Sequence, residues 1–208
     1  MRIVVGLGNP GARYERTRHN IGFLVVEAMS QGATWQSTTQ ALTTPCWLGP
    51  ERHEVLLVKP QTFMNRSGQA LAELQQVTDV EPEQVLVVLD DFLLDFGRLR
   101  LRRGGSDGGH NGLASVLQHL STEAVPRLRL GVGPVPESEQ DIEYVLAPFA
   151  ATEDVDELIQ RGCAATTCWV TEGVEAAMNR FNGCLPVSPR ADHTSRPVHR
   201  NKIGRAHV

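Results

Sequence analysis

The sequence lacks the hydrophobic run that a membrane-spanning helix needs, because no segment approaches roughly 20 consecutive apolar residues. It also lacks a charged stretch followed by an apolar stretch near Met1, so we expect no secretory signal segment. None of its cysteines forms a Cys-x-x-Cys pair, and reduced thiols in a cytoplasmic protein are the expectation. The cysteines are Cys46, Cys163, Cys168 and Cys184.

An excess of positive charge is missing as well. The 208-residue chain carries a net charge of −4, which argues against a uniformly basic nucleic-acid-binding protein. The positive charge is nevertheless clustered and almost entirely arginine, which favours a local basic face on an acidic protein. The clusters are Arg13, Arg16 and Arg18; Arg98, Arg100, Arg102 and Arg103; and Arg127 and Arg129.

A glycine-rich stretch near the N-terminus is the first candidate site. The β-branched run Ile3 to Val5 predicts a buried strand that ends at a glycine. The glycines that follow permit a tight turn and close backbone approach, which would leave Asn9 facing a cleft. His19 and Asn20 then open an apolar pattern that predicts a helix. The sequence therefore predicts an imidazole at a helix N-terminus, beside the loop that carries Asn9.

The spacing of these glycines also fits the dinucleotide-binding fingerprint Gly-x-Gly-x-x-Gly. That fingerprint requires a helix that begins within the glycine turn and a second strand that ends in an acidic residue. Residues 12–17 are instead polar and aperiodic, and Glu27 lies inside the predicted helix. We therefore reject the dinucleotide-binding fingerprint. The function that it would indicate, a nucleotide-dependent oxidoreductase, is still kept as an alternative hypothesis, which the absence of a thermal shift with NAD or NADP would exclude.

The loop 61–68 is a second candidate, because it precedes a predicted amphipathic helix. Asn65 or Ser67 would ordinarily be the N-cap of that helix, since both residue types are favoured there. The neighbouring Phe63 and Met64 are predicted to be exposed apolar residues. They could form the floor of a ligand cleft.

A carboxylate pair follows the apolar run 85–89, which predicts a strand covered on both faces. Asp90 and Asp91 come where this strand is predicted to end. Such carboxylates are often helix caps or turn formers, but no helix is predicted to begin here. Because an open α/β sheet places site residues at strand ends, we favour a functional role for one of the two.

Two further strands are predicted to carry arginine on one face. Residues 98–102 and 127–133 alternate with period two, so their guanidiniums line one face while the other packs inward. Arginines two positions apart repel one another, and a polyanion such as a phosphate backbone would offset this. The segment 104–112 is rich in glycine, and its amides could bind phosphate or let a substrate pass closely. Asn111 could be only a helix N-cap, and His110 a packed supporting residue.

The C-terminal third is less informative. We expect irregular structure at 138–149 and helical structure at 151–182, with a break near Thr166 and Thr167. We also expect one α/β domain over residues 1–183. The tail 184–208 is predicted to be disordered, and its last residues resemble a translated sequencing adapter rather than natural protein.

Four motifs in this order closely resemble bacterial-type peptidyl-tRNA hydrolase, from Met1 to about Asn182. They are Gly6-Leu-Gly-Asn-Pro-Gly11, Thr17-Arg-His-Asn20, Lys59-Pro-x-Thr-Phe-Met-Asn-x-Ser-Gly68 and Gly104-Gly-Ser-x-Gly-Gly-His-Asn-Gly112. The resemblance implies a single α/β domain with a twisted mixed sheet flanked by helices. It implies hydrolysis of the ester between peptide and tRNA, which recycles tRNA from stalled or aborted translation. It also implies a cytoplasmic monomer without metal, cofactor, membrane association or obligate protein partner.

The resemblance also implies roles for individual residues. The catalytic base matches His19, the carboxylate that stabilises its basic form matches Asp90, and Asn9 matches the residue that distinguishes blocked from free aminoacyl-tRNA. Expected substrate contacts are Tyr14, Phe63, Asn65 and Asn111, with Met64 beside them, and expected tRNA-phosphate contacts are Arg100, Arg102 and Arg129. Residues 92–97 lack an aspartate and a proline that the family usually has there.

Two other functions stay open at this point. A catalytically silent RNA-binding relative would use the same basic cleft, and it would bind tRNA without cleaving the ester. A plain esterase is a weaker alternative, because it leaves the arginine faces unexplained.

Overall fold

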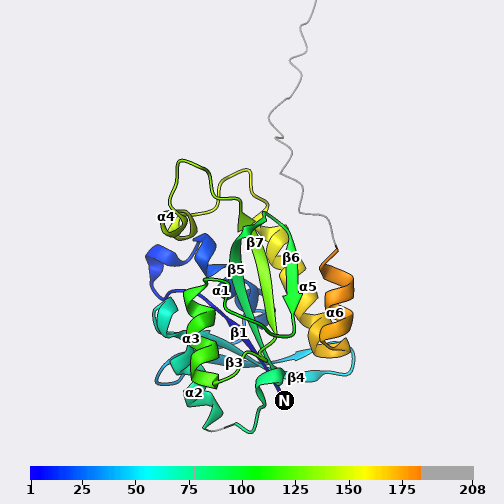
Figure 1. The fold of residues 1–208 in the computed structure, drawn as a ribbon. Coiled ribbons are helices and arrows are strands. Elements are labelled where there is room, and N and C mark those ends of the chain that lie inside the picture. The colour runs from blue at the N-terminus through cyan, green and yellow to red at the C-terminus, as the bar shows by residue number, and fades with distance from the viewer. Residues whose placement is uncertain (77, 184–208) are drawn as a thin grey trace, which may run out of the picture.

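The computed structural model describes residues 1–76 and 78–183. Within them one twisted sheet of seven strands runs through the molecule in the order β2-β3-β4-β1-β5-β7-β6 (Figure 1). The strands are β1 (Arg2–Gly6), β2 (Gln36–Ser37), β3 (Ala41–Leu48), β4 (His53–Pro60), β5 (Val85–Asp95), β6 (Leu99–Arg102) and β7 (Arg127–Gly133). The central strands β4, β1, β5 and β7 are parallel, and antiparallel strands complete both edges. This is the predicted mixed sheet.

Helices cover both faces of the sheet (Figure 1). The helices are α1 (Ile21–Ser30), α2 (Ser67–Gln75), α3 (Asn111–Leu120), α4 (Asp141–Leu146), α5 (Val155–Glu172) and α6 (Val174–Phe181), with short 3₁₀ turns η1 (Ala12–Tyr14), η2 (Arg18–Asn20), η3 (Met64–Arg66) and η4 (Pro82–Gln84). Helices α1, α5 and α6 share one hydrophobic core with the sheet, and α2 and α3 share the other.

The alternation of side chains along the central strands creates these two cores. On β5, Leu86 and Val88 pack on the α1 and α5 side, while Val87 and Leu89 pack on the α2 and α3 side, and all four are fully buried. Burying each such side chain contributes about 1.5–3 kcal/mol. A strand buried on both faces therefore reads as a continuous apolar run, as predicted for residues 85–89.

Helix α1 approaches the sheet very closely at a pair of glycines. A Cβ atom on Gly22 would lie 2.3 Å from the carbonyl oxygen of Val88, and one on Gly6 would lie 2.2 Å from the carbonyl oxygen of Gly22. Only glycine permits this backbone contact. The contact places the start of α1, and with it the preceding turn η2, against the carboxyl ends of β1 and β5.

Three sequence-based predictions of local structure are wrong. Strand β5 continues past the carboxylate pair to Asp95, with a register shift against β7 between Asp91 and Asp95. The segment 138–149, predicted to be irregular, contains α4. The break in the C-terminal helical region lies at Gly173, between α5 and α6, rather than near Thr166 and Thr167.

Two further predictions concern the C-terminal tail and membrane crossing. The tail 184–208, which was predicted to be disordered with a non-native end, lies outside the described residues. Among the residues that the structure describes, every helix is too short or too polar to cross a membrane.

Candidate active site

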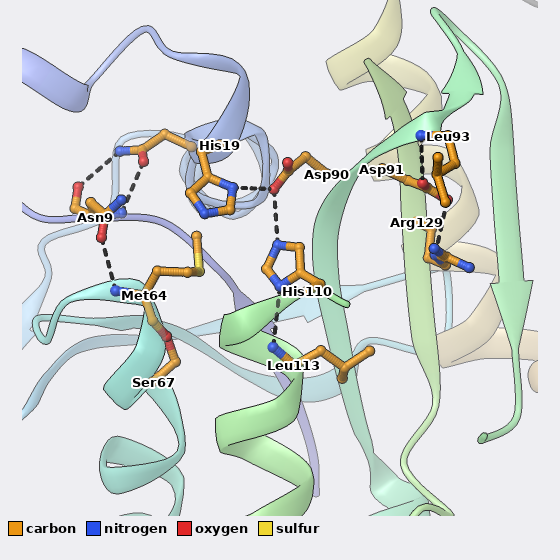
Figure 2. Close-up of polar contacts among 11 residues, drawn as sticks. Asn9, His19, Met64, Ser67, Asp90, Asp91, Leu93, His110, Leu113 and Arg129 are labelled. Carbon is orange, nitrogen blue, oxygen red and sulfur yellow. Dashed lines mark hydrogen bonds and ion pairs between the residues drawn. The ribbon is translucent and has the colours of Figure 1, made fainter. Parts of the chain in front are cut away.

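His19 and Asp90 meet at the carboxyl edge of the sheet (Figure 2). His19 lies in the turn η2, directly before α1, and its Nδ1 is 2.8 Å from Oδ1 of Asp90. Asp90 lies on β5 and its side chain is 2% exposed, whereas the ring of His19 is 15% exposed. The imidazole therefore donates Nδ1–H to a buried carboxylate, and its Nε2 carries the lone pair.

Asp90 also accepts from a second imidazole. The Nε2 of His110 lies 3.0 Å from the same Oδ1 of Asp90. Burial by itself raises the pKa of Asp90, but the charges and hydrogen bonds of His19 and His110 outweigh burial and hold the pKa well below its usual range. Asp90 is therefore an ionised acceptor for both rings.

His110 is oriented from its other side by helix α3. Its Nδ1 accepts the backbone N–H of Leu113 at 3.2 Å, which makes His110 the N-cap of α3. Because Nδ1 is an acceptor, the proton of the neutral ring is on Nε2, where it points to Asp90. His19, Asp90 and His110 are grouped closely enough to be considered as metal ligands. In this tautomer, however, His110 presents a donor rather than a lone pair, so the cluster fits a hydrogen-bond network better than a metal centre.

Asn9 is fixed on three sides. Its backbone N–H donates to Oδ1 of Asn20 and its backbone carbonyl accepts from Nδ2 of Asn20, both at 2.9 Å. Its side-chain oxygen accepts the backbone N–H of Met64 at 2.8 Å. Since that oxygen is occupied, the NH₂ group of Asn9 is left as the donor, and it has no partner within the described residues.

A cavity of about 380 Å³ joins these groups. Its lining residues are Asn9, His19, Asp90, Phe92, Gly109, His110, Asn111, Asp141, Ile142, Val145 and Leu146. Of the predicted site residues, Asn9, His19, Asp90 and Asn111 are therefore brought together. Helix α4 supplies one wall of this cavity and the N-terminus of α3 supplies another.

Other predicted substrate contacts lie outside the lining of this cavity. Tyr14 is half-buried in η1 under the guanidinium of Arg13, and Phe63 and Asn65 are exposed around η3. Met64, predicted to be exposed, is 5% exposed and points toward the two imidazole rings (Figure 2). It is held there because the α2 region packs on α3, where a Cβ on Gly112 would meet its sulfur at 2.4 Å.

The predicted N-caps in these loops also differ from the structure. The residue before α2 is Arg66, without a capping side chain, and the hydroxyl of Ser67 donates to the carbonyl of Met64 instead. Asn111 is the first residue of α3, one position after its N-cap. Asn65 and Asn111 are therefore not required as caps, and both side chains are exposed.

The predicted arginine face exists, but its members differ. Arg100 lies opposite Arg129, and Arg102 opposite Arg127, on the paired strands β6 and β7. Arg100 and Arg102 are exposed. Like charges placed opposite one another are destabilising unless something compensates them. Arg129 is compensated by Asp91, whose Oδ2 lies 2.9 Å from its Nε.

Arg127 does not contribute to an open basic face. It is 3% exposed, and its guanidinium donates to the backbone carbonyls of Val125 at 2.8 Å and Ser106 at 3.0 Å. Burial and the like charge of Arg129 lower the pKa of Arg127. Arg127 thus attaches the glycine-rich loop to the start of β7, and the alternation of the sequence could not distinguish it from its exposed neighbours.

Sequence reasoning gave no role to Asn20 and left His110 open as a packed supporting residue, although both residues shape the site. Asn20 holds both backbone polar groups of Asn9, and His110 shares the carboxylate of Asp90. The available signal was position, because Asn20 lies next to His19 in the motif 17–20 and His110 lies next to Asn111 in the glycine-rich motif 104–112. Residue type alone did not reveal that they bond to other site residues.

Comparisons with known proteins agree with this geometry. The family model described as peptidyl-tRNA hydrolase matches residues 3–190. The peptidyl-tRNA hydrolase of Moorella thermoacetica is 50% identical over 186 residues, covering 86% of this chain and 97% of the relative. That of Rhodopirellula baltica is 43% identical over 187 residues, covering 88% and 97%.

Solved structures lead to the same assignment. The crystal structure of peptidyl-tRNA hydrolase from Acinetobacter baumannii superposes with a TM-score of 0.81 at 33% identity, covering 90% of this chain and 97% of that one. A complex of peptidyl-tRNA hydrolase with n-propanol gives the same values. The family model spans all seven strands, except for Arg2 at the start of β1, and both walls of the cavity. The chain belongs to the peptidyl-tRNA hydrolase family.

Proposed function

We propose that this protein hydrolyses the ester between peptide and tRNA in peptidyl-tRNA, and that His19 is the general base that activates the attacking water. The observation that carries this proposal is the 2.8 Å contact between Nδ1 of His19 and Asp90, at the wall of a cavity that Asn9 and Asn111 also line. It leaves Nε2 of His19 free to accept a proton.

The reaction needs no covalent enzyme intermediate. No serine or cysteine is among the described residues that line the cavity. Water forms the new bond to the ester carbonyl carbon as His19 takes its proton, and the bond to the ribose oxygen then breaks as that proton is returned to it. General-base catalysis of this kind contributes about 10²–10⁴-fold. Asp90 keeps the Nδ1–H tautomer and stabilises the imidazolium that forms.

Amide groups are suited to the carbonyl oxygen of the substrate. The NH₂ group of Asn9 is a donor held in place by Asn20 and Met64, and Asn111 lines the same cavity. Neutral donors stabilise a developing oxyanion without adding a charge that would attract other anions. We assign Asn9 and Asn111 to this role, and Asn65 to the peptide backbone next to it.

The tRNA is proposed to bind along β6 and β7. Arg100 and Arg102 are exposed there and have no carboxylate partner among the described residues. Phosphates of the acceptor arm would compensate the repulsion along this face and release counterions. Arg129 would take part only where a phosphate competes with Asp91 for its guanidinium.

The peptide is proposed to extend from the ester toward the opposite side of Asn9. Asn9 also lines a second cavity of about 430 Å³, which is bordered by Phe23, Leu42 and Lys59 of α1, β3 and β4. Glu15, next to Tyr14, and Gln61, two residues before Phe63, also line this cavity. The two arms of the substrate would then extend in different directions from His19.

The cellular location and the oligomeric state of the enzyme are also proposals. The reduced thiols expected from the sequence agree with a cytoplasmic location. We propose that residues 1–183 form one domain that acts as a monomer, as the resemblance to peptidyl-tRNA hydrolase implies.

The test compares a blocked with an unblocked substrate. The protein should hydrolyse N-acetyl-aminoacyl-tRNA and leave the corresponding free aminoacyl-tRNA largely intact, as measured by release of the labelled amino acid. Hydrolysis of neither substrate, together with tRNA binding, would instead favour a catalytically silent RNA-binding protein. Equal hydrolysis of both would contradict the role that the family resemblance implies for Asn9, which is to distinguish blocked from free aminoacyl-tRNA.

A further inference from the structure

Arg18, directly before His19, is a buried charge without a role in the chemistry described above. The residue is 7% exposed. Its Nη2 lies 2.9 Å from Oε2 of Glu153, and its Nη1 donates to the backbone carbonyl of Pro148 at 2.8 Å. The guanidinium also stacks on the ring of Tyr144 at 4.2 Å. We call these contacts with Tyr144, Pro148 and Glu153 the Arg18 anchor.

The backbone reinforces the same attachment. The N–H of Arg18 donates to the carbonyl of Ala147 at 3.2 Å, and Thr17 forms an isolated antiparallel bridge with Pro148. The turn that carries His19 is therefore fastened to the segment just after α4 by both main chain and side chain.

The fastened segment belongs to the wall of the active-site cavity. Helix α4 contributes Asp141, Ile142, Val145 and Leu146 to the lining. It has only six residues, which is too short for a helix to be stable by itself in water. Its position must therefore be fixed from outside. Tyr144 provides one such contact, donating its hydroxyl to the carbonyl of Val132 at 2.6 Å, and the Arg18 anchor provides the other.

We propose that Arg18 is a positioning residue that holds the α4 wall in register with His19, with Glu153 as its essential partner. Arg18 does not line the cavity and does not contact the reacting atoms. Arg18 links two walls of the cavity, because its guanidinium is bound to the α4 segment while its backbone continues directly into His19. The inference rests on the proposed function for its kinetic consequence, but not for its structural one.

Only arginine fits this position. A carboxylate, a backbone carbonyl and an aromatic face surround one planar group, and the guanidinium has donors in a fixed fork as well as a face that stacks. A lysine would keep the charge and one contact but would lose the fork and the stacking. Removing Glu153 would leave a buried guanidinium without a counter-charge, which strongly destabilises this arrangement.

The experiment uses Arg18→Lys and Glu153→Gln in the full chain. Arg52→Lys is the matched control, because Arg52 also stacks on an aromatic ring, that of Trp47, but lies in the exposed turn between β3 and β4. Values of kcat and KM for N-acetyl-aminoacyl-tRNA are measured well below the melting temperature of each variant. The imidazole Nδ1–H resonance of His19 is recorded by ¹⁵N-edited NMR, without substrate.

Both anchor variants should lower kcat/KM about 10- to 100-fold, through a lower kcat and a higher KM, since small displacements of catalytic groups are that costly. Both should shift or broaden the Nδ1–H resonance of His19, whereas Arg52→Lys should change neither quantity. The double variant should lose little more than either single variant, because the two residues form one unit.

Two results would overturn the proposal. One is unchanged kinetics and an unchanged His19 resonance in variants that are merely less stable, which would make Arg18 a structural residue only. The other is additive losses in the double variant. If Arg18→Lys fails to fold, Glu153→Gln decides by the same measurements. The NMR result does not depend on turnover, so a wild type without hydrolase activity would refute the proposed function and leave this inference testable.

Discussion

His19 and Asp90 are 71 residues apart in the chain, yet Nδ1 of the imidazole lies 2.8 Å from the carboxylate. The contact exists because β1 and β5 are parallel neighbours and α1 packs on them through Gly22. The carboxyl ends of both strands meet at one edge, where His110 approaches Asp90 from the opposite face of the sheet. The position of the base is therefore a direct consequence of the sheet topology.

Asp90→Asn should lower kcat by about 10²-fold or more, because an amide neither enforces the tautomer of His19 nor stabilises the imidazolium. Single-turnover rates for N-acetyl-aminoacyl-tRNA measure this loss. A rate close to that of the wild type would show that Asp90 does not act through the imidazole.

The same carboxylate should affect stability in acid. Burial raises the pKa of Asp90, but His19 and His110 lower it by more, so its folded pKa lies below the unfolded value of about 3.9. Such a group stabilises the fold above the unfolded pKa, and this contribution is lost as the pH falls through the folded pKa. Below about pH 4, urea midpoints of the wild type should therefore fall more steeply than those of Asp90→Asn. Parallel curves would contradict the low pKa.

Replacing Arg100 and Arg102 together by alanine should raise KM for full-length tRNA substrate and spare a minimal ester. Two fewer phosphate contacts should also make the slope of log affinity against log salt shallower by about 1–2. Titrations of tRNA binding at several salt concentrations measure this slope. Equal losses on both substrates would assign these arginines to structure instead.

Arg127→Ala, in contrast to the Arg100 and Arg102 variants, should lower stability and leave tRNA binding unchanged. It removes a buried guanidinium that donates to the carbonyls of Ser106 and Val125, so we expect a loss of about 2–4 kcal/mol in the free energy of unfolding. The salt dependence of tRNA binding should stay close to that of the wild type. A shallower salt slope with unchanged stability would show that Arg127 contacts phosphate after all.

The sequence predicted the central strands well because their pattern is local. The apolar run 85–89 and the alternation at 98–102 and 127–133 each indicate a strand whatever surrounds them. The same alternation could not show that Arg127 is buried and Arg100 exposed. That difference depends on Val125 and the glycine-rich loop, which are brought there by the tertiary structure.

The wrong predictions have physical reasons as well. Helix α4 was missed because its stability comes from distant partners, Arg18 and Val132, rather than from its own six residues. Thr166 and Thr167, the residues near which the break was expected, lie inside α5, where Thr167 donates its hydroxyl to the carbonyl of Cys163 four residues before it. The actual break is at Gly173, whose φ is 92°.

The candidate site was predicted to the extent that its residues occur in motifs. His19, Asp90, Asn9 and Asn111 do converge on one cavity. The shared use of Asp90 by His110 was not predicted, because a histidine next to a helix could equally be an ordinary packed residue. Arg18 was placed with Arg13 and Arg16 in a basic face, but it is buried, and the burial of a charged residue can be recognised only once its partners are known.

The most direct test of the mechanism is single-turnover hydrolysis of N-acetyl-aminoacyl-tRNA by His19→Ala. Asp90 keeps its contact with His110 when the His19 ring is removed, so the fold should stay intact, as circular dichroism and the melting temperature can verify. If His19 is the base that activates water, the rate should fall about 10²–10⁴-fold while tRNA binding is retained. A folded His19→Ala protein that turns over at nearly the wild-type rate would contradict the account.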